Sequence, residues 1–381
     1  MKSYDLVVAG AGPAGLTLAW KAAEEGLSVF VFDKKSEAGD VSYTTSGSFI
    51  DLDRWGLPRE VCHPITDIHF ASPNYFVERS GSACVIDRRR LLDELERRCI
   101  ASGATLDYGT YARHVDVRDN NITCVCLDKE VLVEGEVYAD CSGIGGVFNK
   151  RLPINTNPVR QALGFEYIVP LKSEPHLSEL YVGGDFPGGY GWLFPVSEEK
   201  AIVGVGTLNR MYFPNVRDYL DRMMTMPRIS RRVENRILES HSGVFNTGSP
   251  LRKFNRGNLI LVGDVALQGN PVAGEGVRFV MDSADMAAKA VVDAVSSRDT
   301  RLLEGYSSSW VGKYYSTFQT GYVIQKLLTA LSTREGLLDW CVKAGGKASD
   351  RTWLTLLRGE ADYKFIMKKL PKLMYKPFIK S

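Results

Sequence analysis

The sequence predicts an α/β protein with a Rossmann-like dinucleotide-binding domain, an inserted antiparallel β-sheet and a helical C-terminus. Three observations predict this fold. The chain opens with an apolar run that ends in a glycine turn and leads into helical spacing. Residues 160–210 alternate polar and apolar side chains, as the strands of an antiparallel sheet do. Residues 301–381 are mostly helical in pattern.

The opening segment is typical of a strand, a turn, a helix and a second strand. An apolar strand before Gly10 leads into a G-x-G-x-x-G turn, and residues 16–25 then predict a helix that Gly26 ends. Residues 27–33 predict the second strand, and its last residue, Asp33, lies eighteen positions after the last glycine of the turn. The glycine pattern alone is weakly informative, but in this context it predicts a dinucleotide-binding site.

The three glycines of the turn have different predicted roles. Gly10 allows the tight turn, Gly12 lets a pyrophosphate approach the backbone, and Gly15 lets helix and strand pack closely. The phosphate is expected at free N–H groups of the helix N-terminus. Asp33 is expected to accept hydrogen bonds from ribose hydroxyls.

Composition narrows the function classes. The 381 residues suit two domains, and the formal net charge of +2 does not indicate a nucleic-acid partner. The seven cysteines form no C-x-x-C pair and no apolar run reaches membrane-spanning length, so we expect a reduced, cytoplasmic protein. No metal site is predicted, because the five histidines lack ligand spacing relative to one another. They are His63, His69, His114, His176 and His241.

Four separated elements indicate FAD rather than a nicotinamide cofactor. The first is the glycine turn with Asp33, and the second is Arg88, a cation at a helix start that can reach the adenosine or pyrophosphate. The third is the sequence Ala-Asp-Cys-Ser-Gly at 139–143. In the fourth, Asp264 would hold a ribityl hydroxyl, and N–H groups at 274–277 would stabilise negative charge on the reduced flavin ring.

Because these elements lie far apart in the chain, we predict a discontinuous FAD-binding domain with a substrate domain inserted into it. The FAD-binding domain is expected to comprise residues 1–65, 84–155 and 250–300. The antiparallel-sheet substrate domain would comprise residues 66–83 and 156–249, and residues 301–381 would form a C-terminal helical region.

These residues resemble the flavoproteins built like p-hydroxybenzoate hydroxylase and, within that group, the geranylgeranyl reductase family, which includes archaeal digeranylgeranylglycerophospholipid reductases. The distinguishing segment, residues 189–195 with the sequence Gly-Tyr-Gly-Trp-Leu-Phe-Pro, is similar to the Y-x-W-x-F-P motif of that family. The resemblance implies that this motif lies beside the flavin and the prenyl chain. An aromatic strand that ends in proline makes a rigid apolar wall. An ordinary aromatic core strand is the alternative.

The resemblance also implies cofactor contacts at matching positions. The loop over residues 34–47 is expected to fold over the cofactor, and at 44–47 this chain reads Thr-Thr-Ser-Gly where many relatives have a cysteine. A cysteine that tunes the flavin or assists proton delivery is therefore not expected here. The predicted cofactor-binding residues are Gly10, Gly12, Pro13, Ala14, Gly15, Asp33, Thr44, Thr45, Gly47, Arg88, Ala112, Asp264, Gly274, Gly276 and Val277.

The C-terminal residues 356–380 resemble the closing helices of archaeal members. A basic amphipathic segment can rest on an anionic membrane surface and admit a lipid substrate, so we expect a peripheral membrane contact. A solvated helical tail packed on the core fits the pattern equally well. The lysines are Lys364, Lys368, Lys369, Lys372, Lys376 and Lys380, and the apolar residues are Phe365, Ile366, Leu370, Leu373, Met374 and Phe378.

The resemblance implies an FAD-dependent oxidoreductase that saturates C=C bonds of an isoprenoid, geranylgeranyl-type chain in lipid biosynthesis, by hydride transfer from reduced flavin. The predicted catalytic residues are Tyr190, Trp192, Phe194 and Pro195, which would align chain and flavin, with Tyr190 as candidate proton donor. NAD(P)H, ferredoxin or a similar small donor would supply electrons, because the chain has one dinucleotide motif. The alternatives are a flavin monooxygenase or halogenase of the same fold, a non-redox FAD-dependent isoprenoid cyclase, and a nucleotide-binding module without catalysis.

Overall fold

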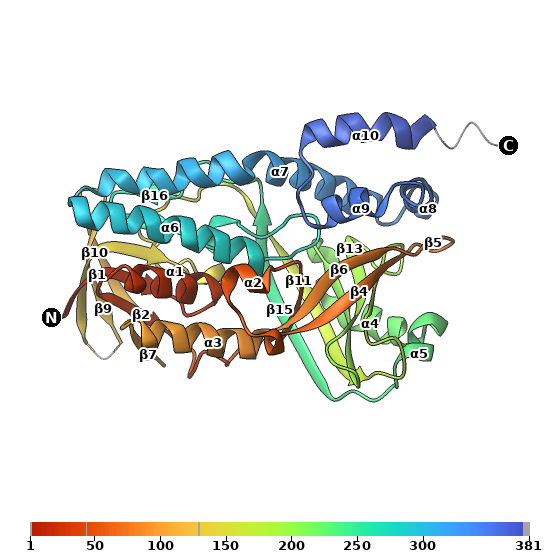
Figure 1. Ribbon diagram of the computed structural model, residues 1–381, viewed down its shortest axis with the longest axis horizontal. Helices are drawn as coiled ribbons and strands as arrows, with labels where there is room; N and C mark the ends of the chain where they lie inside the picture. The colour runs from red at the N-terminus through yellow and green to blue at the C-terminus, as the bar shows by residue number, and fades with distance from the viewer. Residues whose placement is uncertain (1, 43, 129, 376–381) are drawn as a thin grey trace.

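The computed structural model describes residues 2–42, 44–128 and 130–375, and two β-sheets run through them (Figure 1). The strands of the first sheet are β1 (Lys2–Ala9), β2 (Val29–Asp33), β7 (Thr105–Tyr108), β8 (Ala112–Arg118), β9 (Asn121–Leu127), β10 (Leu132–Asp140), β16 (Asn255–Arg256) and β17 (Leu259–Leu261). They lie in the order β16–β17–β10–β1–β2–β7, with β9 paired to β10 and β8 paired to β9. The central neighbours from β17 to β7 are parallel, as the dinucleotide-binding pattern predicts.

Helices α1 (Pro13–Glu24), α3 (Arg88–Ala101) and α6 (Val277–Ser297) pack against the first sheet, and α1 contacts the other two. The helix predicted from residue 16 begins earlier, at Pro13, because proline suits the first turn of a helix, where no N–H is needed. The strands and α1 bury long runs of apolar side chains, as central parallel strands do. This packing fixes the glycine turn between β1 and α1.

The strands of the second sheet are β3 (Thr45–Ser48), β4 (Cys62–Ala71), β5 (Phe76–Val77), β6 (Ser80–Asp87), β11 (Val159–Pro170), β12 (Leu177–Tyr181), β13 (Gly189–Pro195), β14 (Lys200–Thr207) and β15 (Glu239–Gly248). They lie in the order β15–β11–β14–β13–β12–β4–β6–β3, with β5 paired to β4. The predicted antiparallel sheet is confirmed except at one pair, since β12 and β4 are parallel. These two strands are far apart in sequence, so no tight hairpin fixes their direction.

Residues 45–47 correct the expectation of a continuous loop over 34–47. They form strand β3, which pairs with β6 at the edge of the second sheet. Gly47 lies against the ring of Phe194, since an added Cβ would come within 3.1 Å of it. The segment 1–65 therefore contributes strands to both sheets, and the domain boundaries given above stay a prediction.

The second sheet is covered on both faces. Helices α4 (Val216–Thr225) and α5 (Pro227–Arg232) pack on one face. Helices α8 (Glu335–Gly345) and α9 (Asp350–Leu357) cover part of the other, where Trp353 stacks on Phe70 with ring centroids 4.4 Å apart. The long α7 (Glu304–Leu331) connects the two halves of the molecule, and α10 (Tyr363–Tyr375) ends the described chain (Figure 1).

The helical C-terminus is confirmed over the described residues. Lys376, Phe378 and Lys380, which belong to the predicted basic segment, lie outside them. Among the helices that the structure describes, we find none that combines the length and the apolar character needed to cross a bilayer.

Candidate functional site

The glycine turn has the geometry that its sequence predicts. Gly10 has φ of +106°, and an added Cβ would lie 2.5 Å from the carbonyl oxygen of Cys141. An added Cβ at Gly15 would lie 1.9 Å from the carbonyl oxygen of Gly10, so strand and helix approach closely here. At Gly12, by contrast, an added Cβ would meet no heavy atom of the described residues within 4 Å. The space beside Gly12 is therefore open for a ligand.

Two helices at this site begin without a side-chain cap. Among the described residues, no side chain accepts a hydrogen bond from the first turn of α1, which follows Gly12, or of α6, which follows Gly276. Asp87 caps the neighbouring α3 in the ordinary way. The exposed N–H groups and the helix dipoles of α1 and α6 therefore favour an anionic ligand such as a phosphate.

Asp33 braces the glycine turn, and its predicted contact with ribose stays a prediction. Its carboxylate accepts hydrogen bonds from the backbone N–H groups of Ala11 (2.7 Å) and Lys35 (3.0 Å). The Lys35 ammonium donates a 3.1 Å hydrogen bond to the carbonyl of Ala11. Burial lowers the pKa of Lys35, and the negative charge of Asp33 opposes this shift. Ala112 begins β8 nearby, two residues after Thr110, whose N–H donates to the carbonyl of Asp33. The sequence analysis missed Lys35.

The third predicted element, residues 139–143, has a scaffolding role. Asp140 is fully buried, and its carboxylate accepts hydrogen bonds from Ser142, Phe148 and Asn149. Burial raises the pKa of Asp140, and these hydrogen bonds oppose that shift. The carboxylate thus holds the loop that places the Cys141 carbonyl against the glycine turn.

The structure brings Arg88, Asp264 and Thr44 into one region. Burial raises the pKa of Asp264, while the positive charge of Arg88 acts in the opposite direction. The backbone N–H of Arg88, at the start of α3, donates to the carbonyl of Thr44 at 2.9 Å. Ala14, in the first turn of α1, lies against Gly263, the residue before Asp264. Predicted cofactor residues from four separate segments therefore meet at the ends of the parallel strands.

The loop before α6 is tied to the second sheet at two points. The Tyr190 hydroxyl donates a 2.6 Å hydrogen bond to the carbonyl of Ala273, beside Gly274. Glu275 is buried, and its carboxylate accepts hydrogen bonds from the Ser48 hydroxyl (2.6 Å) and the Phe49 N–H (3.0 Å). These ties hold Gly274, Gly276 and Val277 next to the aromatic strand. Glu275 was not among the predicted site residues.

Strand β13 presents its aromatic residues on one face. Tyr190, Trp192 and Phe194 follow the two-residue period of a strand, with ring centroids 5.6 and 6.3 Å apart. Leu193 and Pro195 occupy the alternate positions of the strand and therefore point to the opposite face, where Leu193 belongs to the core under α4. The structure therefore corrects the expectation that Pro195 belongs to the same wall as the three aromatic side chains.

Trp192 lies over two glycines of the neighbouring strand. An added Cβ at Gly204 would come within 2.4 Å of the indole ring, and one at Gly206 within 3.2 Å. Only glycine leaves room for the ring in this position, because a strand residue directs its Cβ out of the sheet. The indole is 8% exposed and forms a flat apolar surface.

Tyr190 is poorly suited to donate a proton. Its hydroxyl hydrogen is engaged with the Ala273 carbonyl, and burial raises its pKa to about 12. A phenol with this pKa stays protonated near neutral pH and is a weak acid. The structure therefore disfavours the predicted role of Tyr190 as proton donor.

Two polar residues, Glu166 and His241, lie on the same face of the second sheet as Trp192, and the sequence analysis did not predict them. Trp192, Gly204, Glu166 and His241 are paired in register across β13, β14, β11 and β15, so they share one face. The His241 ring lies 3.8 Å from Glu166 and 3.3 Å from the Thr44 hydroxyl. Thr44 and His241 are separated by 197 positions along the chain, so only the three-dimensional structure reveals their proximity.

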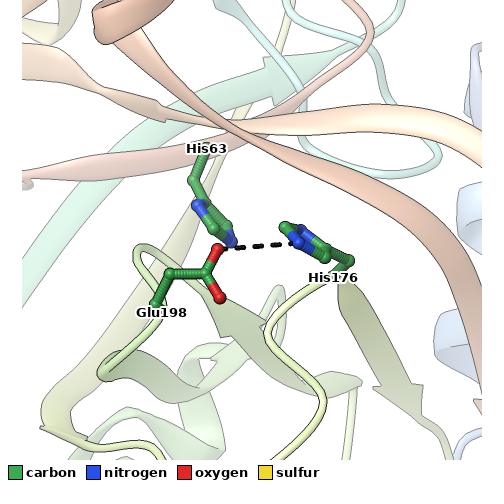
Figure 2. A group of neighbouring side chains, drawn as sticks. All are labelled: His63, His176 and Glu198. Carbon is green, nitrogen blue, oxygen red and sulfur yellow. Dashed lines mark ion pairs between the residues drawn. The ribbon is translucent and has the colours of Figure 1, made fainter.

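His63, His176 and Glu198 form the group in the described chain that most resembles a metal site (Figure 2). His63 Nε2 lies 2.6 Å from the Pro175 carbonyl oxygen and His176 Nδ1 lies 3.0 Å from that of Pro64, so both nitrogens act as donors. The two rings stack with 14° between their planes. The nitrogen lone pairs of each ring lie in its plane, so they lie in nearly parallel planes and do not point to one shared metal position. We interpret the group as a stacked pair that holds β4 to the loop before β12.

Relatives of known name match most of this chain. A digeranylgeranylglycerophospholipid reductase from Methanosarcina acetivorans is 30% identical over 336 residues, which cover 81% of this chain and 80% of the relative. The chain belongs to the digeranylgeranylglycerophospholipid reductase family. Reductase 2 of this name from Methanopyrus kandleri is 27% identical over 97% of this chain and 96% of its own. The family model described as lycopene cyclase protein also matches, over residues 5–328, so the chain belongs to that family as well.

Solved structures of flavoproteins share the fold of this reductase-family chain. A geranylgeranyl bacteriochlorophyll reductase-like protein from Thermoplasma acidophilum superposes with a TM-score of 0.83 at 21% identity, covering 98% of this chain and all of the other. A flavin-dependent brominase superposes with a TM-score of 0.72 at 17% identity, covering 99% of this chain and all of the other. At these identities the likeness concerns the fold, and it confirms the predicted architecture.

Proposed function

We propose that this chain is an FAD-dependent reductase that saturates C=C double bonds in the geranylgeranyl-type chain of a lipid. The observation that carries the proposal is the contact between the aromatic strand and both loops predicted to hold the flavin. Tyr190 is bonded to the Ala273 carbonyl, and Phe194 packs on Gly47. The names of the relatives, reductases of digeranylgeranylglycerophospholipids, support the substrate class.

FAD fits the residues present at the predicted site. The open space at Gly12 accommodates a pyrophosphate, and the uncapped helices α1 and α6 offer N–H groups to the phosphates and to the flavin edge. Arg88, at the start of α3, and Asp264, which follows β17, lie close enough to interact and can bind further polar groups of the cofactor. When bound, reduced FAD supplies the hydride for the reaction.

The protein's own contribution is alignment and exclusion of water. An isolated alkene accepts hydride poorly, so the chain and the cofactor must be held in contact in a dry site. Trp192 and Phe194 provide flat apolar surfaces for an isoprenoid, and the buried side chains of β4 and α8 extend this apolar region. Tyr190 joins this apolar surface to a loop predicted to hold the flavin, because its hydroxyl donates a hydrogen bond to the Ala273 carbonyl.

Mass spectrometry of the lipid product tests the proposal. Purified protein with FAD, a reductant and a geranylgeranyl lipid is expected to add two hydrogens for each bond saturated. NAD(P)H and reduced ferredoxin, supplied separately, identify the electron donor. An unchanged lipid mass with loss of the linear substrate would instead support cyclisation, which the match to the lycopene cyclase family makes the second candidate. Addition of oxygen would support a monooxygenase.

The position of Trp192 gives a specific prediction for this reaction. Gly204→Ala places a methyl group within 2.4 Å of the indole and must displace the ring from the aromatic face. We expect the rate of lipid saturation to fall by about 100-fold, because misplacement of a substrate by about 1 Å has effects of that size. Gly312→Ala, at an exposed helical glycine, is the control. Retained activity in a folded, flavin-loaded Gly204→Ala variant would contradict a role for Trp192.

The C-terminal helices support a membrane contact, which we propose as the route for the lipid. Helices α7, α8 and α10 follow one another towards the C-terminal end of the chain (Figure 1), and they contact one another. They carry exposed apolar side chains beside the basic segment. Exposed apolar and basic side chains together favour an anionic lipid surface. The apolar residues are Val323, Leu327, Leu337, Trp340 and Met367.

Sedimentation with lipid vesicles tests this contact. The protein is expected to bind vesicles that contain phosphatidylglycerol and to leave them in high salt. Neutralisation of Lys364, Lys368 and Lys369 to glutamine should weaken binding by about 100-fold, since each lysine contributes about 1 kcal/mol near such a surface. The matched control neutralises Lys2, Lys253 and Lys289, which lie on β1, in the loop before β16 and on α6. Equal binding of both triple variants would contradict the proposal.

A further inference from the structure

A proton path leads from the protein surface to the predicted flavin loop, and this inference rests on the proposed function. Saturation of an alkene needs a proton as well as a hydride, and the structure disfavours Tyr190 as its source. We propose that His241 passes a proton to the hydroxyl of Thr44, which delivers it into the site. Glu239 connects the ring to solvent, and buried Glu166 lies beside its inner nitrogen.

The distances form a connected series. His241 Nε2 lies 3.2 Å from the Glu239 carboxylate, and Nδ1 lies 3.3 Å from the Thr44 hydroxyl. The exposed fraction falls along the series, from 41% for the Glu239 side chain to 12% for His241 and 5% for Thr44. The series therefore begins at water and ends inside the protein, which a proton path into a dry site requires.

The inner end of the path is fixed at the predicted cofactor site. The Thr44 carbonyl accepts a hydrogen bond from the N–H of Arg88, and the next residues form β3, where Gly47 packs on Phe194. The Thr44 side chain is thus held between His241 and the segment expected to cover the flavin. A threonine hydroxyl can accept one proton while it releases another, so it can relay without changing charge.

Two carboxylates flank the His241 ring on its two nitrogens. Buried Glu166 lies 3.8 Å from Nδ1, and Glu239 lies 3.2 Å from Nε2. Nε2 therefore faces the solvent-exposed Glu239 and Nδ1 faces the protein interior, so a proton can enter the ring at one nitrogen and leave it at the other. Glu166 belongs to the same row across the sheet as Trp192 and His241, so the imidazole ring and the apolar wall share one face.

The proton step balances with the proposed reduction. The O–H bond of Thr44 breaks as its proton forms a C–H bond at one alkene carbon, using the electrons of the double bond. The Nδ1–H bond of His241 breaks as the Thr44 hydroxyl is restored. Water supplies a proton to Nε2 of His241 in the same transfer, so the ring stays neutral, and exchange of its proton with solvent then restores Nδ1–H for the next turnover. Reduced flavin, when bound, would supply the hydride for the second C–H bond and would be oxidised by that transfer.

Paired variants of Thr44 separate a relay from a structural role. Thr44→Val keeps the shape but removes the hydroxyl, and Thr44→Ser keeps the hydroxyl. In ¹⁵N-histidine-labelled protein without lipid, we expect Thr44→Val to shift the Nδ1 resonance of His241 and Thr44→Ser to leave it near its original position. This measurement needs no turnover. An unshifted resonance in Thr44→Val would overturn the hydrogen-bond path.

Turnover measurements complete the test. Thr44→Val and His241→Gln should each lower the saturation rate by about 100-fold with flavin still bound, as loss of a general acid does, and Thr44→Ser should stay within about threefold. His114→Gln is the control, since His114 is exposed and pairs with Asp116 on the first sheet. If Thr44→Val loses its flavin, the saturation rate of His241→Gln decides whether the relay operates. Wild-type rates in His241→Gln would overturn the relay.

The resonance and turnover measurements together also distinguish failure of the relay from failure of the proposed reductase function on which it rests. If the wild-type protein yields no saturated lipid, the proposed reductase activity is wrong. The Nδ1 resonance then decides alone whether Thr44 and His241 are joined as proposed. If the wild type is active and the variants are equally active, the reductase stands and the relay is wrong.

Discussion

Gly12→Ala is expected to abolish flavin binding while the protein stays folded. The new methyl group would enter the open space beside the turn, where it meets no described atom within 4 Å. Gly12 has φ of −89°, which alanine also adopts, so the free energy of unfolding should change by no more than about 1 kcal/mol. The methyl group would instead occupy the position of the pyrophosphate. We expect FAD affinity to fall by at least about 100-fold, or about 2.7 kcal/mol.

Gly15→Ala is the informative comparison. Its Cβ would lie 1.9 Å from the backbone oxygen of Gly10, which cannot move aside, so this variant should lose both flavin and about 3 kcal/mol of stability. Flavin absorbance of the purified proteins and urea unfolding without added FAD measure the two effects. Normal flavin content in Gly12→Ala would contradict the assignment of this turn to the cofactor.

The sequence predicts those features that depend on neighbouring residues. The turn between β1 and α1, the strand that ends at Asp33 and the helix that begins at Val277 each follow from a local pattern of glycines and apolar residues. The aromatic strand β13 was found in the same way. The alternation of side chains along β13 also predicts that Pro195 faces away from Tyr190, whereas the motif places both residues in one wall.

The remaining features depend on register between distant strands. Glu166 and His241 share a face with Trp192 because β15 pairs with β11, β11 with β14 and β14 with β13, and His241 meets Thr44 although β15 and β3 lie at opposite ends of the strand order. Single-sequence patterns do not specify such pairings. The bracing of the glycine turn by Asp33 has a similar origin, since it requires the parallel pairing of β1 with β2. Polar residues inside otherwise apolar strands are the signal that could have pointed to Glu166.

A buried ion pair in the second sheet should have the largest effect on stability. Arg232, at the end of α5, is 4% exposed, and its guanidinium lies 2.8 Å from the carboxylate of Glu179 on β12. It also donates to the carbonyls of Glu174 and Leu177 at 2.8 and 2.9 Å. Arg232→Met would leave the Glu179 charge in the core, and we expect the free energy of unfolding to fall by about 3–5 kcal/mol.

The neighbouring Arg228 provides the matched control for Arg232. It approaches the same Glu179 carboxylate at 3.8 Å, but 44% of its side chain is exposed, so Arg228→Met should cost no more than about 1 kcal/mol. Combining Arg232→Met with Glu179→Leu removes the stranded charge and should recover at least half of the loss, because the cost arises mainly from an unpaired buried ion. Urea unfolding of the three variants measures these differences. A double variant as unstable as Arg232→Met would mean that the hydrogen bonds to the two carbonyls, and not the charge of Glu179, determine the cost.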